Sequence, residues 1–310
     1  MELDFVARVI ASIPPDPRLE VPPGDDAAVI RPPAERRTVV TVDMLMDGVD
    51  FRLGSDCTPR QVGHKALAVS LSDLAAMAAR PEVAVAAVAL PRHQGDEIGR
   101  GVLDGMLALA ARHGITLAGG DTNAWDGPLV VSITALGSVP PGAAWRRDGA
   151  HAGDLLVVSG ACGGSLLGRH LAVTPRIDEA LAVAAAFEVH AAIDVSDGLS
   201  LDLSRMMLAS GTGAILDLAA VPIHPDAVIM AARDADRLAP LDHALGDGED
   251  FELLLAMPAA EALRLAAAPV AGTRFTVIGE VTSGSGLSVR QADGTTAALV
   301  PRGYEHAFDG

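Results

Sequence analysis

The chain has little cysteine, little lysine, few aromatic residues and no long hydrophobic run. Cysteine occurs twice, as Cys57 and Cys162, without a Cys-x-x-Cys pair, which argues against a disulfide framework and a thiolate metal site. Lys65 is the single lysine, so arginine supplies nearly all of the fixed positive charge. A membrane span needs roughly 18 to 20 apolar residues. The longest candidate, residues 75–90, is interrupted by the Arg-Pro-Glu run at 80–82, and no membrane association is expected.

The balance of charge is strongly acidic. The formal net charge is −17 at pH 7. Proteins usually approach nucleic-acid phosphates and anionic membranes with basic patches, so neither is an expected partner. The first residues, Met-Glu-Leu-Asp-Phe, place acids where a secretion signal needs a basic region, and we expect a cytoplasmic protein. An acidic protein that handles phosphorylated molecules needs positive charge between its carboxylates and the phosphates, which divalent cations can supply.

Helix-like and strand-like patterns alternate along the sequence. Strands are expected at residues 39–42, 83–90, 115–118, 129–137, 155–159, 214–218, 251–257 and 276–278. Helices are expected at residues 61–79, 96–113, 165–173, 177–189 and 200–210, with a long glycine-rich turn at 119–127. This mixture favours an α+β architecture over a doubly wound sheet. The Val-Pro-Pro-Gly segment at 139–142 is the best linker candidate, so we expect domains at 1–140 and 150–310.

Two familiar nucleotide-binding motifs are absent. The single lysine lies in Gly-His-Lys-Ala at 63–66, and no Gly-x-x-x-x-Gly-Lys-Ser/Thr loop occurs. No Gly-x-Gly-x-x-Gly motif opens a helix after a strand. P-loop and Rossmann chemistry are therefore not expected. Several histidines are interpreted as surface or capping residues rather than bases: His64, His93, His113 and His190.

Aspartates recur where expected strands or helices meet turns. They stand in the segments Gly24-Asp-Asp-Ala27, Thr41-Val-Asp43, Ser72-Asp73, Gly119-Gly-Asp-Thr122, Asp194-Val-Ser-Asp-Gly198 and Gly246-Asp-Gly-Glu-Asp250. Each alone is ordinary turn and capping chemistry, and Ser196 or Asp197 could simply cap a helix. Asp73 differs, because it lies in an apolar helical pattern where an unpaired carboxylate is costly. Magnesium prefers oxygen ligands shared between carboxylates and phosphates, so converging aspartates would point to bound cations.

Taken in order, these segments resemble the thiamine-monophosphate kinase family, which belongs to the superfamily of aminoimidazole ribonucleotide synthetase and selenophosphate synthetase. The resemblance covers nearly the whole chain. It rests on Gly24-Asp-Asp-Ala-Ala-Val29, Thr41-Val-Asp-Met-Leu45, residues 65–77 (KALAVSLSDLAAM), Gly119-Gly-Asp-Thr122, Ala192-Ile-Asp-Val-Ser-Asp-Gly-Leu199, Gly248-Glu-Asp-Phe-Glu-Leu253 and Gly303-Tyr-Glu-His306.

The resemblance implies a fold, a reaction and a set of site residues. The fold is an amino-terminal domain that binds ATP and magnesium and whose sheet pairs across a homodimer, with a carboxy-terminal α/β domain closing the active-site cleft. The reaction transfers the γ-phosphoryl group of ATP to thiamine monophosphate with several Mg²⁺ ions and no covalent nucleophile. Family metal positions match Asp26, Thr41, Asp43, Asp73, Asp121, Asp194 and Asp197. Nucleotide contacts match Gly120, Asp121, Arg147 and Ser196, and substrate contacts match Glu249 and Tyr304.

The sequence also departs from the family pattern. Asp50 stands where the family usually has a histidine that contacts the substrate, and Asn-Ala-Trp at 123–125 replaces the familiar continuation after Gly-Gly-Asp-Thr. Two alternatives stay open. One is another ATP-dependent reaction of the superfamily. Some relatives with such reactions need a reactive cysteine near the amino terminus or at the carboxy terminus, whereas here no cysteine precedes residue 57 and the chain ends Phe-Asp-Gly. The other is a non-catalytic dimer that binds cations or a thiamine ester.

Overall fold

The computed structural model describes residues 8, 10–23, 27–233, 237–291 and 294–305. The described chain divides into two compact units, one formed mainly by residues up to 144 and the other mainly by residues from 145 onward. Short segments are exchanged, since residues 75–78 belong to the second unit and residues 171–173 to the first. Among the helices of the described residues, none is both long enough and apolar enough to cross a membrane.

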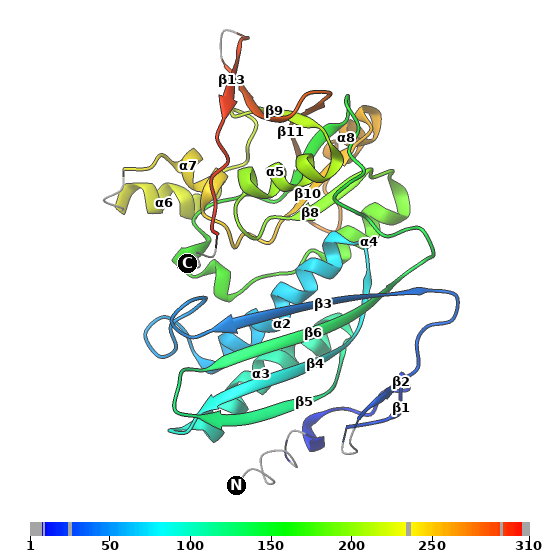
Figure 1. Cartoon of the computed structure of the whole chain (residues 1–310), viewed down its shortest axis with the longest axis vertical. Coiled ribbons are helices and arrows are strands. Elements are labelled where there is room, and N and C mark those ends of the chain that lie inside the picture. The colour runs from blue at the N-terminus through cyan, green and yellow to red at the C-terminus, as the bar shows by residue number, and fades with distance from the viewer. Residues whose placement is uncertain (1–7, 9, 24–26, 234–236, 292–293, 306–310) are drawn as a thin grey trace. The chain divides into compact units, whose positions relative to one another are not determined.

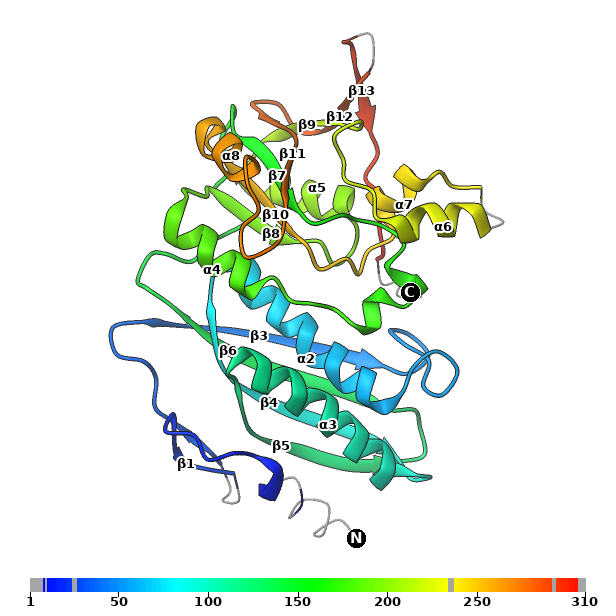
Figure 2. The same cartoon turned by 180° about the vertical axis from the view of Figure 1, so that it is seen from behind.

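The first unit is built on a sheet with helices on one face (Figures 1 and 2). Its strands lie in the order β3-β6-β4-β5, with β4 and β5 parallel and the other neighbours antiparallel. The elements are β3 (Arg37–Met46), α2 (Pro59–Ala76), β4 (Arg80–Pro91), α3 (Gly95–His113), β5 (Thr116–Trp125) and β6 (Val130–Val139). A separate antiparallel pair is formed by β1 (Leu19–Val21) and β2 (Val29–Ile30).

Strand β3 separates polar and apolar side chains by its alternation. Successive side chains of a strand point to opposite faces of the sheet. Thr41 and Asp43 share the face of the buried Leu45, while Val42 and Met44 point the other way and are 63% and 60% exposed. The Val42 side chain therefore lies on the face opposite Asp43.

The second unit surrounds a larger mixed sheet. Its strands lie in the order β13-β12-β9-β11-β7-β10-β8, and β12 and β9 are the parallel neighbours. The strands are β7 (Leu155–Ser159), β8 (Ala191–Asp194), β9 (Gly213–Asp217), β10 (Leu253–Met257), β11 (Phe275–Thr282), β12 (Gly286–Arg290) and β13 (Thr296–Leu299). The helices are α4 (Ile177–Ala186), α5 (Leu199–Ser210), α6 (Pro225–Arg233), α7 (Pro240–Gly246) and α8 (Ala259–Ala266).

The core of the second unit lies between α5 and the sheet. Leu199, Leu203 and Met206 of α5 are fully buried with Leu156 and Leu254 of the strands. Figures 1 and 2 show α8 on the other side of this sheet, where it contacts β7 and β11. Both faces of the central strands are therefore covered, which explains why β10 is apolar throughout its length.

The mixed α+β class predicted from the sequence is confirmed, with two local corrections. Residues 119–127 do not form one long turn, because β5 continues to Trp125 by pairing with β4, and this pairing overrides the weak strand propensity of glycine. The helix predicted at 165–173 is replaced by two short 3₁₀ turns, Ser165–Leu167 and Arg169–Leu171. Gly168 separates them at φ 123°, outside the helical region. The sequence prediction also missed β1, β2, β8, α6, α7, α8, β12 and β13.

Candidate active site

Two carboxylates converge where β3 faces helix α2. Asp43 and Thr41 lie on the same face of β3, and Ser70 and Asp73 lie three residues apart on α2, which places them on one side of the helix. The Thr41 hydroxyl donates a hydrogen bond to the Asp73 carboxylate. The Ser70 hydroxyl donates to Oδ2 of Asp43 over 2.6 Å. The chain thus brings together two predicted metal ligands that are thirty positions apart.

The electrostatics of this pair favour a cation. Burial, and then the negative charge of Asp73, raise the pKa of Asp43 to about 6, while the hydrogen bond from Ser70 opposes the rise. A divalent cation between the two carboxylates would remove the repulsion and restore the ionised form of Asp43. Thr41, Asp43 and Asp73 form a set of hard oxygen donors, which fits Mg²⁺.

Asp121 occupies a different place in the first unit. The strand register aligns it with Ala87 of β4, Ser132 of β6 and Met44 of β3, on the open face of the sheet. Three strand spacings put its backbone roughly 14 Å from that of Met44. Its Oδ1 accepts a local hydrogen bond from the Thr122 N–H over 2.9 Å. Within one chain, Asp121 is therefore not brought to Asp43 and Asp73.

Gly120, next to Asp121, lies against β4. A Cβ atom at this position would overlap the carbonyl oxygen of Ala86. A glycine is required here by close packing of the two strands, whatever ligand its backbone contacts.

Asp50 closes the turn that follows β3. Its Oδ2 accepts a hydrogen bond from the Met46 N–H over 2.7 Å, and its carbonyl oxygen accepts one from Nζ of the fully buried Lys65, also over 2.7 Å. The carboxylate therefore already stabilises its own turn. Asp26, another predicted metal ligand, lies outside the described residues.

A second group of predicted site residues lies at the end of β8. This strand ends at the buried Asp194, and the turn with Ser196 and Asp197 leads into α5. Three successive N–H groups, those of residues 196, 197 and 198, donate to Oδ2 of Asp202 over 3.0, 2.9 and 3.2 Å. Arg205 donates to the carboxylates of both Asp197 and Asp202.

Asp202 and Arg205 are positioning residues that the sequence analysis missed. An acidic residue in the first turn of a helix is the signal that could have identified Asp202, because such residues pair with the unsatisfied N–H groups there. Burial raises the pKa of Asp202, although the backbone hydrogen bonds and Arg205 oppose this. Its carboxylate fixes the shape of the turn that presents Ser196 and Asp197.

Two distant segments are attached to the same turn. The Glu249 N–H donates to the carbonyl oxygen of Ser196 over 2.6 Å, and the Tyr304 N–H donates to that of Asp197 over 2.9 Å. Glu249 and Phe251 adopt backbone φ values of 53° and 52°, which residues other than glycine rarely adopt. Such backbone strain is common at ligand sites. The structure therefore brings Ser196, Asp197, Glu249 and Tyr304 together.

Buried ion pairs stabilise the segment that contains Glu249 and Phe251. Asp250 accepts hydrogen bonds from the Gly163 N–H and from Arg169, each within 3.0 Å. Burial raises the pKa of Asp250 to about 7, and Arg169 partly offsets the effect. Glu252 accepts two hydrogen bonds from Arg176, of 2.8 and 2.5 Å.

Arg147 lies apart from the Ser196–Asp197 turn. The preceding carbonyl, that of Arg146, accepts a hydrogen bond from the Ala192 N–H at the start of β8, whereas Ser196 follows the end of the strand. The Arg147 carbonyl accepts a hydrogen bond from the Ser210 hydroxyl over 2.8 Å. Its side chain is exposed.

Comparison with known proteins places this arrangement in a family. The model of the AIR synthase related protein N-terminal domain matches residues 24–139, and that of the C-terminal domain matches residues 133–291. The thiamine-monophosphate kinase of Rhodopirellula baltica is 42% identical over 313 residues, covering 99% of this chain and 97% of its own. That of Escherichia coli K12 is 35% identical, covering 91% and 90%.

Solved structures agree with these relatives. The thiamine-monophosphate kinase of Stenotrophomonas maltophilia K279a superposes with a TM-score of 0.80 at 36% identity, over 95% of this chain and 96% of its own. AaThiL complexed with AMPPCP and TMP has a TM-score of 0.77 at 25% identity, over 99% and 96%. The hydrogenase maturation protein HypE of E. coli, at 20% identity and a TM-score of 0.77 over 98% and 97%, shares the fold. By the identity and coverage of its relatives, this chain belongs to the thiamine-monophosphate kinase family and carries both domains of the AIR synthase related proteins.

Proposed function

We propose that the protein phosphorylates thiamine monophosphate to thiamine diphosphate with ATP. Relatives that span the whole chain are thiamine-monophosphate kinases, and AaThiL binds AMPPCP and TMP. The observation within this chain that carries the proposal is the pair Asp43 and Asp73, with the Thr41 hydroxyl directed at the second carboxylate. Two facing carboxylates on a rigid strand and helix suit the binding of a metal-complexed polyphosphate.

The proposed reaction is a direct transfer between two phosphates. An oxygen of the thiamine monophosphate phosphate forms a bond with the γ-phosphorus of ATP, and the bond from that phosphorus to the β,γ-bridging oxygen breaks, which leaves ADP. Both reactants are anionic, so positioning and charge neutralisation supply most of the catalysis. Mg²⁺, when bound, would neutralise and orient the phosphates.

The chain's own residues would divide these tasks. In the first unit, Thr41, Asp43 and Asp73 would hold metal. In the second, Asp202 and Arg205 keep the Ser196–Asp197 turn in shape for ligand binding. The remaining proposed metal ligands are Asp26, Asp121, Asp194 and Asp197. The proposed nucleotide contacts are Gly120, Asp121, Arg147 and Ser196, and the proposed substrate contacts are Asp50, Glu249 and Tyr304. The first unit, expected over residues 1–140, would bind ATP and metal, and the second, over 150–310, would complete the site.

We further propose that the protein acts as a cytoplasmic homodimer. The open face of the first sheet carries Val40, Val42 and Met44, each at least 60% exposed. A row of exposed apolar side chains on an open sheet face is costly in water, and a second copy of the same sheet would cover it. Asp121 lies on this face and would point toward the second copy.

The decisive experiment is incubation of the purified chain with ATP, Mg²⁺ and thiamine monophosphate. Thiamine diphosphate and ADP are expected in equal amounts. Neither product is expected when thiamine replaces thiamine monophosphate as the acceptor. Raising Mg²⁺ above the ATP concentration should increase the rate, because the aspartates hold metal beyond the ion bound to ATP. Binding of thiamine monophosphate without product would instead support the non-catalytic dimer, and ATP hydrolysis without thiamine diphosphate would favour another reaction of the superfamily.

A further inference from the structure

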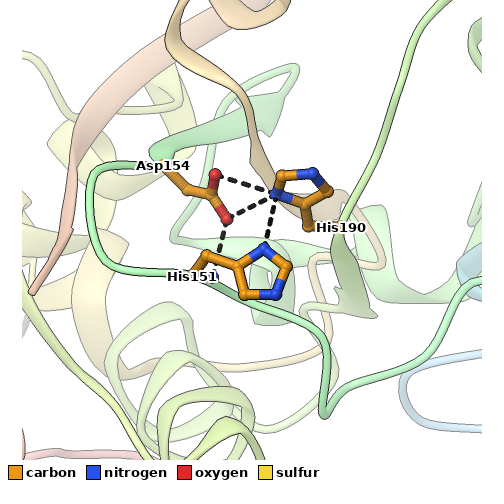
Figure 3. A group of neighbouring side chains, drawn as sticks. All are labelled: His151, Asp154 and His190. Atoms are coloured by element: carbon orange, nitrogen blue, oxygen red, sulfur yellow. Dashed lines mark hydrogen bonds and ion pairs between the residues drawn. The ribbon is translucent and has the colours of Figure 1, made fainter. Parts of the chain in front are cut away.

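Two histidines and an aspartate converge at the end of the second sheet that lies opposite the Ser196–Asp197 turn (Figure 3). Asp154 immediately precedes β7, and His190 immediately precedes β8. Both strands pair antiparallel with β10, so their first residues meet at the same edge of the sheet. Four residues of β8 separate this edge from the other end, which is roughly 13 Å along a strand.

The backbone around the three side chains is firmly held. The Asp154 carbonyl accepts a hydrogen bond from Val281 of β11 over 2.8 Å, and the His190 N–H donates to Ala256 of β10 over 2.9 Å. The His151 N–H donates to Oδ2 of Asp154, also over 2.8 Å. The three side chains therefore project from a preorganised edge, which lowers the entropic cost of binding a ligand between them.

The three ligand atoms lie within 4.8 Å of one another. Nδ1 of His190 is 2.9 Å from both carboxylate oxygens of Asp154 and 3.2 Å from Nδ1 of His151. A tetrahedral zinc ion with bonds of about 2.0 to 2.2 Å holds its ligand atoms about 3.3 to 3.5 Å apart. For the two contacts of His190, a widening of a few tenths of an ångström, within reach of small side-chain rotations, would reach these separations.

The chemistry of the donors also fits a metal. A carboxylate accepts hydrogen bonds only, so the contact between Nε2 of His190 and Glu188, at 3.3 Å, has the nitrogen as donor. By the same argument Nδ1 donates to Asp154 in the metal-free protein, so an ion would bind at Nδ1 by displacing that proton. The Glu188 contact would then orient the ring, as a second carboxylate does for many ligating histidines. Asp154 is 4% exposed, and a divalent cation would replace the proton of His190 as the charge partner of this buried carboxylate.

We propose that His151, Asp154 and His190 form a binding site for one divalent transition-metal ion of the zinc class. Imidazole nitrogens favour zinc and its late first-row neighbours, whereas magnesium favours oxygen, so this site would not compete with the proposed phosphate-binding metals. Three protein ligands leave room for a water molecule as the fourth. The bound ion would join the starts of β7 and β8 and stabilise the second unit.

The test is zinc binding to the metal-free full-length protein, measured by calorimetry in excess Mg²⁺ and without nucleotide. One Zn²⁺ per chain is expected, together with a rise in melting temperature. His151→Ala, at an exposed position, should weaken binding at least about tenfold without altering the metal-free melting temperature. His93→Ala, at another exposed histidine in the first unit, is the matched control and should bind as the unchanged protein does.

Co²⁺ absorption provides a second readout, which would not change if the role of His151 were only structural. Co²⁺ bound to the site should give visible absorption bands that Zn²⁺ removes and that His151→Ala abolishes. The proposal is overturned if the unchanged protein takes up no zinc, if excess Mg²⁺ displaces it, or if His151→Ala binds equally well. None of these measurements depends on kinase activity, so the outcome is separate from that of the proposed function.

Discussion

Replacement of Asp73 by asparagine separates the structural and functional roles of the Asp43 and Asp73 pair. Asparagine keeps the shape of the side chain and can still accept the Thr41 hydrogen bond through its amide oxygen. It removes the negative charge that faces Asp43. The variant should therefore fold at least as well as the unchanged protein, yet lose most of its kinase activity.

The size of each effect follows from the pKa of Asp43. Its rise from 3.8 to about 6 corresponds to about 3 kcal/mol against the ionised form, at about 1.4 kcal/mol per pH unit. Burial is the larger cause, so removal of the Asp73 charge should stabilise the metal-free protein by at most about 1 kcal/mol, or about 3 °C in melting temperature. Loss of one charge-stabilising group at the reacting phosphates should lower turnover by at least about a hundredfold, or about 2.7 kcal/mol.

The assay combines thermal melting in EDTA with thiamine diphosphate formation under saturating ATP and Mg²⁺. Asp104→Asn, at an exposed carboxylate of α3 in the same unit, is the matched control and should change neither quantity. A fall of several degrees in the melting temperature of Asp73→Asn would make this carboxylate structural. Turnover within threefold of the unchanged protein would refute its role in catalysis.

Three further predictions concern packing, pH dependence and assembly. Gly120→Ala forces a methyl group onto the carbonyl oxygen of Ala86 and should cost about 1 to 3 kcal/mol in unfolding free energy, measured by denaturant titration; an unchanged midpoint would contradict the close packing. Asp250 has a pKa raised from 3.8 to about 7, so between these pH values the folded state holds a proton that the unfolded state has lost. Stability should therefore fall as pH rises from 4 to 7, by up to about 1.4 kcal/mol per pH unit, and Asp250→Asn should flatten this slope in melts across that range. If both proteins show the same slope, Asp250 is not the responsible group. Val42→Asp places a charge on the open face of the first sheet and should convert a dimer to a folded monomer by light scattering, whereas an unchanged mass would exclude this face as the interface.

Much of the fold could be predicted from local patterns. The helix that contains Asp73 and the end of α3 before Gly114 follow from periodicity and capping, which act over a few residues. The strand expected at 39–42 is present, but β3 continues to Met46 and contains Asp43, which was expected to follow the strand. The predictions failed where distant partners decide. Strand β5, which contains Gly119 and Gly120, forms because β4 pairs with it. Short elements such as β8 carry too few residues to show a periodic pattern of apolar side chains.

The sequence by itself determined which residues could carry the chemistry, because carboxylates and hydroxyls at strand and helix ends are visible in the order of the chain. That Thr41 and Asp43 share one face while Val42 faces away became clear only when β3 was found to extend through Asp43, since the pleat of a strand alternates. Tertiary structure alone decided which of these groups meet. Asp43 faces Asp73, Asp197 pairs with Arg205, and His190 reaches Asp154, each across contacts that sheet register and helix packing create. Hydrogen bonding and pKa depend on distance in space and on burial, and neither quantity is encoded in residue spacing alone.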